Sequence, residues 1–188
     1  MAASVLALGA FVAIEVTTGQ WAYTYLTDAR DVSDTIAAVG VAGFWGASTV
    51  GRLTMAHHGV VCVTDRVGLA GIAAFGALMF LGLIVGPTAV SIVFLGCAGL
   101  ILSPIVPSLF ATTTTRVGTG IDACSSGWQL AATNVGAISV PALIGVLVDP
   151  RGPEIVPVVA ISVLVAIGLP LLVMINRLPD RRVVTLSS

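Results

Sequence analysis

Hydrophobic residues run along the chain in long stretches that five short polar or turn-forming segments interrupt. The interrupting segments are TDARDVSD (27–34), HHGVVCVTDR (57–66), GPT (86–88), TTTTRVGTGIDA (112–123) and DPRGPE (149–154). Because a helix needs about 20 mainly apolar residues to cross a bilayer core, this pattern predicts six membrane-spanning helices. They are expected near residues 2–27, 36–56, 67–86, 89–111, 125–148 and 155–176.

The composition agrees with a chain that lies in a bilayer. Hydrophobic residues make up 57% and charged residues 9%, and the mean hydropathy of +1.08 is too high for the surface of a soluble domain. The sequence therefore predicts an all-α polytopic membrane protein that forms a single bundle over residues 1–188. Arginines and acids nearly cancel and lysine does not occur, so we expect no basic patch and no nucleic-acid partner.

The arginine positions predict an orientation, since cytoplasmic loops hold an excess of positive residues. With both termini in the cytoplasm, only Arg30 and Arg151 lie outside. The arginines on the cytoplasmic side are then Arg52, Arg66, Arg116, Arg177, Arg181 and Arg182. We expect an integral protein of a bacterial inner (plasma) membrane with both termini cytoplasmic.

Polar side chains are unevenly spread over the six spans. The third span has none and the sixth has only Ser162 in its middle. The other spans hold Glu15, Thr17, Thr18 and Gln20, then Trp45, Ser48 and Thr49, then Ser103, Pro104, Pro107 and Ser108, then Gln129, Thr133 and Asn134. Polar groups in lipid are costly unless they face the bundle interior or a cavity, so the first, second, fourth and fifth spans are expected to line one. This pattern favours a 3+3 inverted repeat, as in secondary transporters.

Four stretches carry a resemblance to a known family. They are EVTTGQWAYTYL (15–26), GFWGASTVGRL (43–53), GLILSPIVPSLFA (99–111) and SGWQLAATNVGAISVPALIGVLVD (126–149). With them the chain resembles the C-terminal six-helix half of a major facilitator superfamily (MFS) transporter, nearest the fucose-permease-like branch. The resemblance implies helices seven to twelve of a twelve-helix transporter, without the N-terminal half. It also implies a sugar or similar solute, bound near the midplane against a second six-helix unit, which is another copy or a separate chain.

Glu15 is the acid that the apolar pattern least explains. It lies midway along its span, where an ionised carboxylate without a partner costs at least about 2.5 kcal/mol on insertion scales. One hypothesis is a carboxylate that binds the solute or a coupling proton. The alternative is a protonated or hydrogen-bonded acid that ties the first helix to a neighbour.

Aromatic and polar residues near Glu15 are further candidates for a solute site. At about 100° per residue, Thr18, Ala22 and Tyr25 share a stripe with Glu15, and Trp21 lies on its flank. The stripe predicts one cavity in which a ring stacks on a sugar and Glu15 accepts hydroxyl hydrogen bonds. The alternative places Trp21, Tyr23 and Tyr25 in the outer aromatic belt. The candidate solute or proton residues are Glu15, Thr18, Gln20, Trp21, Tyr25, Trp45, Gln129 and Asn134.

Two polar residues of the fifth span and two prolines of the fourth complete the buried candidates. Gln129 and Asn134 are about 140° apart around their helix, so only one is expected at the cavity, and Asn134 lies nearer the middle of the span. Pro104 and Pro107 lack backbone donors and predict a discontinuous fourth helix, a feature that recurs at transporter sites.

Charged residues at the cytoplasmic ends of the second and third spans have two interpretations. Arg52 and Arg66 can form a gating latch with Asp65, or they can simply reach the interface and fix orientation. MFS proteins often carry a Gly-x-x-x-Asp-Arg-x-Gly pattern in this loop. Here Gly59 is followed by VVCVTDRVG, so only the end of that pattern is present.

The sequence gives no constellation for catalysis or for a cofactor. A nucleophile with its base is missing from the spans, His57 and His58 lack other ligands at metal-binding spacing, and no phosphate-binding Gly-rich motif occurs. We therefore expect no enzyme, no cofactor and no metal, but a proton-coupled secondary transporter present as one half or a fragment. The alternatives are a truncated, non-transporting protein, an assembly subunit whose polar face binds a partner protein, and a membrane enzyme.

Overall fold

A computed structural model describes residues 2–58, 66–117 and 122–177, which are almost entirely helical. These residues form six rods and contain no strand, so the prediction of an all-α chain with six helices is confirmed. The rods are α1 (Ala2–Thr24) with its π-helical end η1 (Tyr25–Ala29); α2 (Asp34–His58); α3 (Arg66–Val85); α4 (Thr88–Leu102) with α5 (Ile105–Val117); α6 (Asp122–Arg151); and α7 (Ile155–Val163), η3 (Leu164–Gly168) and α8 (Leu169–Arg177).

Most of these rods are long and apolar enough to cross a membrane. Within the described residues this holds for Ala2–Ala29, Asp34–His57, Thr88–Ala111, Ser126–Arg151 and Ile155–Ile175. The third rod, α3, has 20 residues, and its segment Gly71–Val85 is apolar as well. Their length and composition fit a membrane protein.

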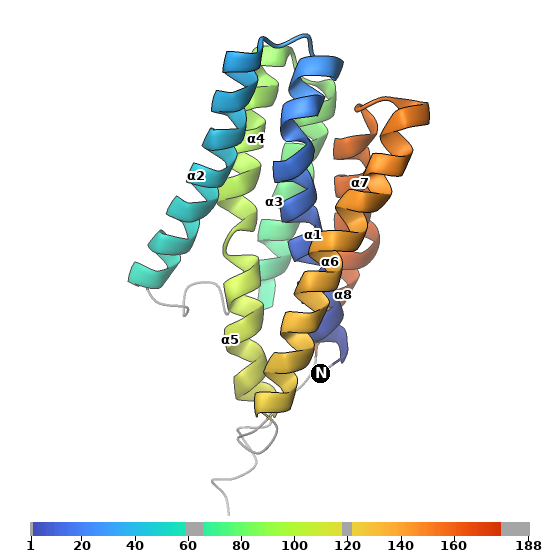
Figure 1. Cartoon of the computed structure of the whole chain (residues 1–188). Coiled ribbons are helices and arrows are strands. Elements are labelled where there is room, and N and C mark those ends of the chain that lie inside the picture. Colours follow the sequence, from blue (N-terminus) through green and yellow to red (C-terminus); the bar gives the residue numbers. More distant parts are fainter. Residues whose placement is uncertain (1, 59–65, 118–121, 178–188) are drawn as a thin grey trace, which may run out of the picture.

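The first rod is the centre of the bundle. In Figure 1, α1 stands between α2 and α6, and the fainter α3 lies behind it. Its most extensive contacts are with α6, and it also packs on α2, α5, α7 and α8. In the most apolar stretch of this rod 67% of residues are buried, against 28% in the second rod and 17% in the fifth. The outer faces of α2 and α6 are therefore free within the described chain.

Glycines bring two pairs of rods into close contact. A Cβ atom at Gly9 would lie 3.0 Å from the carbonyl oxygen of Ala132, and one at Gly136 would overlap the Gly9 backbone. Where α2 meets α4, a Cβ atom at Gly99 would lie 2.5 Å from the carbonyl oxygen of Phe44. Small residues at such crossings let helix backbones approach closely in apolar surroundings. The α1–α6 and α2–α4 pairs are thus fixed by backbone contact.

The fourth rod is interrupted at Ser103 and Pro104, where the prolines predict a discontinuity. Pro104 has no N–H to donate, and α5 begins directly after it. The Ser103 Oγ donates to the carbonyl of Leu100 at 2.8 Å, and the Ser108 Oγ donates to that of Pro104 at 2.7 Å. Pro107 lies in the first turn of α5, where a missing N–H is tolerated. Serine hydroxyls thus bind two of the carbonyls beside the interruption.

Arg30 links the end of the first rod to the end of α3. Its Nη1 donates to the carbonyl of Gly86 at 3.1 Å, and its Nη2 donates to the carbonyls of Ile84, at 2.6 Å, and Leu83. Its Nε donates at 2.8 Å to the hydroxyl of Tyr25, which itself donates to Leu83 at the same distance. The last carbonyls of a helix lack intrahelical donors and carry partial negative charge, so a guanidinium stabilises them. We call this contact the Arg30 clamp.

The glycine contact between α1 and α6 gives a prediction for stability. Gly136→Ala is expected to lower the free energy of unfolding by about 1–3 kcal/mol, because the methyl group overlaps the Gly9 backbone. Gly46→Ala is the matched control, since a Cβ atom there meets nothing within 4 Å and alanine favours a helix by about 1 kcal/mol. Unfolding curves of both variants in detergent measure the difference. Equal stability of the two variants would contradict the close crossing.

Candidate functional site

A charged pair joins α1 to α2 halfway along α1. The Oε1 atom of Glu15 accepts a hydrogen bond from the Ser48 Oγ at 2.7 Å and forms an ion pair with the Arg52 Nη2. Ser48 and Arg52 are one helical turn apart and lie on the same side of α2. The side chain of Glu15 is 10% exposed and that of Arg52 is 41% exposed. We call these three residues the charged cluster.

The chain brings the cluster together because α1 and α2 form a hairpin. The number of residues from Glu15 to Arg30 equals the number from Ser33 to Ser48. Glu15 and Ser48 therefore lie level with each other on the two sides of the hairpin. Arg52 lies one turn further from the hairpin, and its long side chain reaches back to Glu15. A mid-helix carboxylate therefore meets its cation from the neighbouring antiparallel helix.

Arg52 is the charged partner of Glu15 among the side chains that the structure describes. The remaining described charges belong to residues near the ends of the rods, namely Asp28, Arg30, Asp31, Asp34, His57, Asp149, Arg151 and Glu154. Removing one member of a buried pair leaves an uncompensated charge, which is strongly destabilising. Each charge of the cluster consequently depends on the other.

A hollow of about 590 Å³ lies between α1 and α6. The Trp21 Nε1 donates to the carbonyl of Pro141 at 3.2 Å, which fixes the indole ring across the two helices. The lining residues are Gln20, Trp21, Thr24, Ala137, Ile138, Pro141 and Ala142. This volume falls within the range of small-molecule sites, roughly 300–1,000 Å³. The hollow thus offers an amide, a hydroxyl and an aromatic ring to a ligand.

The Trp45 side chain of α2 covers the part of α1 that lies between the charged cluster and the hollow. A Cβ atom at Gly19 would overlap the Trp45 indole, so only glycine lets the ring cover the helix there. The Trp45 ring also meets the Phe44 ring edge-on, with centroids 5.3 Å apart. At 38% exposure, Trp45 keeps part of its surface free. The cluster, Trp45 and the hollow follow one another along α1 and together form the candidate site.

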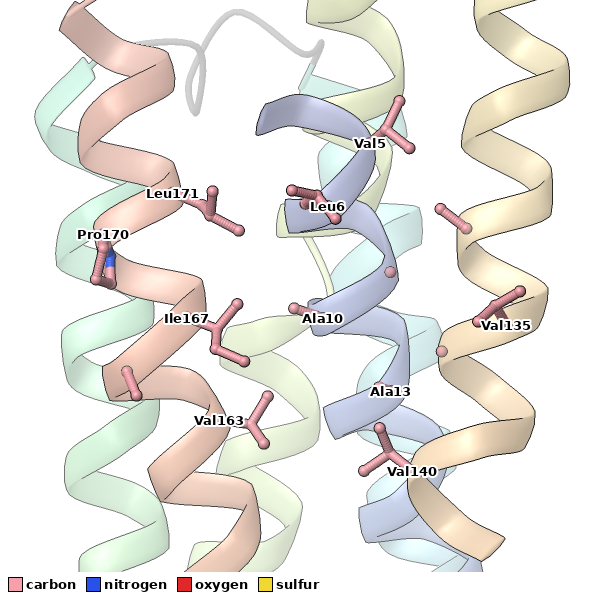
Figure 2. Close-up of a pocket in the computed structure, with 14 residues that line it drawn as sticks. Val5, Leu6, Ala10, Ala13, Val135, Val140, Val163, Ile167, Pro170 and Leu171 are labelled. Carbon is pink, nitrogen blue, oxygen red and sulfur yellow. The ribbon is translucent and has the colours of Figure 1, made fainter. Parts of the chain in front are cut away.

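A second hollow of about 540 Å³ has different chemistry. Figure 2 shows side chains of α1, α6 and the last rod converging on it, including Leu6, Val135, Ile167 and Leu171. All the residues that line it are apolar. A polar solute would lose its hydrogen bonds with water there without replacement, so this hollow does not suit one.

The structure separates three residues that the sequence placed at one cavity. Glu15 faces α2, Trp21 contacts α6, and Tyr25 is buried in the Arg30 clamp against α3. Thr18 is buried, and its hydroxyl donates to the carbonyl of Ile14 at 2.7 Å within its own helix. Tyr23 is exposed and donates to Asp34 at 3.0 Å. The stripe of α1 is thus divided among three neighbouring rods.

The two polar residues of α6 point to different sides, as their spacing predicts. Gln129 is 1% exposed, and its Nε2 has no hydrogen-bond partner among the described residues. Asn134 is exposed, and its Nδ2 donates to the carbonyl of Leu130 at 2.9 Å. It precedes Ile138 by one turn, so it lies on the stripe of α6 that continues into the hollow.

The charged residues at the ends of the second and third spans, interpreted either as a latch or as anchors at the interface, are only partly described. Arg52 pairs with Glu15 rather than lying free at the helix end. Asp65 and the side chain of Arg66 lie outside the described residues. The pairing of Arg52 with Glu15 and Ser48 is what the sequence analysis missed. The signal that could have revealed it is that Glu15 and Ser48 are equally far from the hairpin turn, with Arg52 one helical turn beyond Ser48.

The comparisons with known proteins add no family. No family model, curated protein or solved structure matches the chain.

The charged cluster gives a prediction of energetic coupling. Arg52→Met is expected to lower the free energy of unfolding by about 3–5 kcal/mol, because it leaves the Glu15 carboxylate buried without its cation. The double variant Glu15→Gln/Arg52→Met should recover most of this loss, since no charge remains and the glutamine can still bind Ser48. Denaturant unfolding in detergent at neutral pH measures both. Additive effects of the two substitutions would show that the pair is not coupled.

Proposed function

We propose that the chain is one six-helix half of a secondary transporter for a small polar solute. The charged cluster is its proton-coupling site, and the surface along Trp45 and the hollow binds the solute. The observation that carries this proposal is the Glu15–Arg52 pair at mid-helix, on the same rod as a hollow that Gln20 and Thr24 help to line. Ionisable groups inside membrane-spanning segments most often mark substrate or proton pathways.

The packing of the rods supports the 3+3 inverted repeat that the MFS resemblance implies. Such a repeat relates the first rod to the fourth and the second to the fifth. It therefore relates the α1–α6 contact to the contact between the fourth rod and α2. These are the two most extensive contacts of the bundle, and both depend on glycines. A proline-interrupted fourth rod near the site is a further feature of this class.

The candidate site needs an opposite wall to hold a solute. Gln20, Tyr23, Trp45 and Asn134 are exposed along the surface that α1, α2 and α6 share. A second six-helix unit, either another copy or a separate chain, would close this surface and place the solute near the middle of the bilayer. If the chain is instead a non-transporting assembly subunit, the same surface would bind a partner protein.

Protonation of Glu15 supplies the coupling step. With the carboxylate neutral, the ion pair with Arg52 is lost and α2 is less firmly held to α1. A proton that binds one conformation better than another shifts the population between them. Alternating access then follows from moving one group of helices against the other around the site.

Proteoliposomes that contain the full chain, with any unit that copurifies, test the proposal. Impermeant sugars, polyols and sugar acids are added under an inward proton gradient, and external pH and solute uptake are recorded. We expect one solute class to accumulate with proton uptake, and Glu15→Gln to reduce the accumulation to background while solute exchange continues. Asp149→Asn, at an exposed acid near the end of α6, is the control.

Two outcomes would overturn parts of the proposal. Unchanged gradient-driven accumulation in Glu15→Gln would remove Glu15 from coupling. If no solute of the panel moves protons or accumulates, the transporter hypothesis fails and the assembly subunit is favoured.

A further inference from the structure

Arg52 has more hydrogen-bonding capacity than the cluster uses. A guanidinium carries several N–H donors in a planar fork. One of its nitrogens pairs with Glu15, while 41% of the side chain remains exposed. Planar forks of this kind match the two oxygens of a carboxylate. The exposed part of Arg52 therefore has the geometry of a carboxylate receptor.

The charge balance of the cluster restricts what a proton can do there. With Glu15 ionised, the negative and positive charges of the pair cancel. When a proton neutralises Glu15, Arg52 keeps its charge and loses its partner, because no other acid among the described side chains faces it. A lone cation within a membrane-spanning helix is unfavourable. An anion that binds Arg52 restores neutrality.

We infer that the solute is a small organic anion with one carboxylate, which binds Arg52 in place of Glu15 and enters together with one proton. This inference rests on the proposed function of the same site. The site cycles between two neutral states. In one, ionised Glu15 is paired with Arg52; in the other, protonated Glu15 lies beside Arg52 and the bound carboxylate. The proton and the anion together carry no net charge.

The surroundings favour this class over an uncharged sugar. An uncharged sugar supplies no charge, so it would leave Arg52 unneutralised whenever Glu15 is protonated. The part of the solute beyond its carboxylate would lie along Trp45 toward Gln20 in the hollow. An aromatic face with an amide and a hydroxyl suits a hydroxylated carbon chain. Sugar acids combine both features.

No other described charge competes for this role at the cluster. Ser48 on α2 is uncharged, and His57 lies more than one turn beyond Arg52. In the described parts of α5, α6, α7 and α8, the only charged side chains are Asp149 and Arg151, at the far end of α6. Among the described side chains, the proton and the solute carboxylate therefore act on Glu15 and Arg52.

Gluconate and sorbitol are the matched probes, since gluconate has a carboxylate where sorbitol has a hydroxymethyl group. Binding to the purified full chain is measured by thermal stability in detergent. We expect gluconate to stabilise the protein, more strongly as the pH falls, and sorbitol to have no effect. Glu15→Gln should bind gluconate about tenfold more tightly at neutral pH and lose the pH dependence, because the competing carboxylate is gone.

Variants of Arg52 complete the binding test. The uncharged double variant Glu15→Gln/Arg52→Met leaves no buried charge unpaired and is expected to bind no gluconate. Arg151→Gln, which removes an exposed arginine at the end of α6, should bind gluconate like the original chain. Gluconate binding that survives in the double variant, or its absence in the original chain, would overturn the inference.

Uptake in proteoliposomes separates this inference from the proposed function. Proton-driven accumulation of gluconate but not of sorbitol supports both. Accumulation of sorbitol alone keeps the transporter and overturns the anion. Gluconate binding at Arg52 without any uptake keeps the anion site and overturns transport.

Discussion

An ionised carboxylate cannot remain in the middle of an apolar helix unless the same bundle supplies a cation. In this chain the cation comes from Arg52, one turn beyond the residue that lies level with Glu15 across the hairpin. The pair links α2 to the middle of α1, while the glycine contact at Gly99 holds α2 against α4. One turn before Ser48 on α2, the Trp45 ring lies against Gly19 of α1. The ion pair and the Trp45–Gly19 contact thus lie together where α2 meets α1.

The bundle contains two kinds of contact with different sensitivity to protons. The α1–α6 and α2–α4 pairs meet through glycines, where backbone touches backbone and no charge takes part. The Glu15–Arg52 pair joins one of these units to the other, while the Arg30 clamp joins the end of the first rod to α3. A proton on Glu15 removes the first link and leaves the second. The contacts that Arg30 makes with the end of α3 do not involve Glu15.

The sequence pattern was sufficient to predict where the helical rods lie in the chain. It was insufficient to predict how each rod is rotated about its axis. Apolar stretches between charged or proline-rich breaks determine where helices lie, and the prolines indicated the interruption at Ser103 and Pro104. Which neighbour a residue of α1 meets depends on packing that no single helix encodes. Tyr25 illustrates this, because the carbonyls at the end of α3 and Arg30 bury its hydroxyl. The sequence had offered two positions for that ring, in a cavity with Glu15 or in the outer aromatic belt.

Arg52 also shows why position along a helix does not settle the role of a charge. It precedes His57 by five residues, or about 8 Å of helix, so its long side chain can reach either the interface or Glu15. In the structure it bends inward to the carboxylate. Two environments within reach of one cation are what a two-state element requires, provided that a proton or a ligand changes their relative free energy. A lysine or arginine fixed at the membrane surface would lack the second environment. The buried acid therefore gives an arginine at this position a partner inside the bundle as well as at the interface.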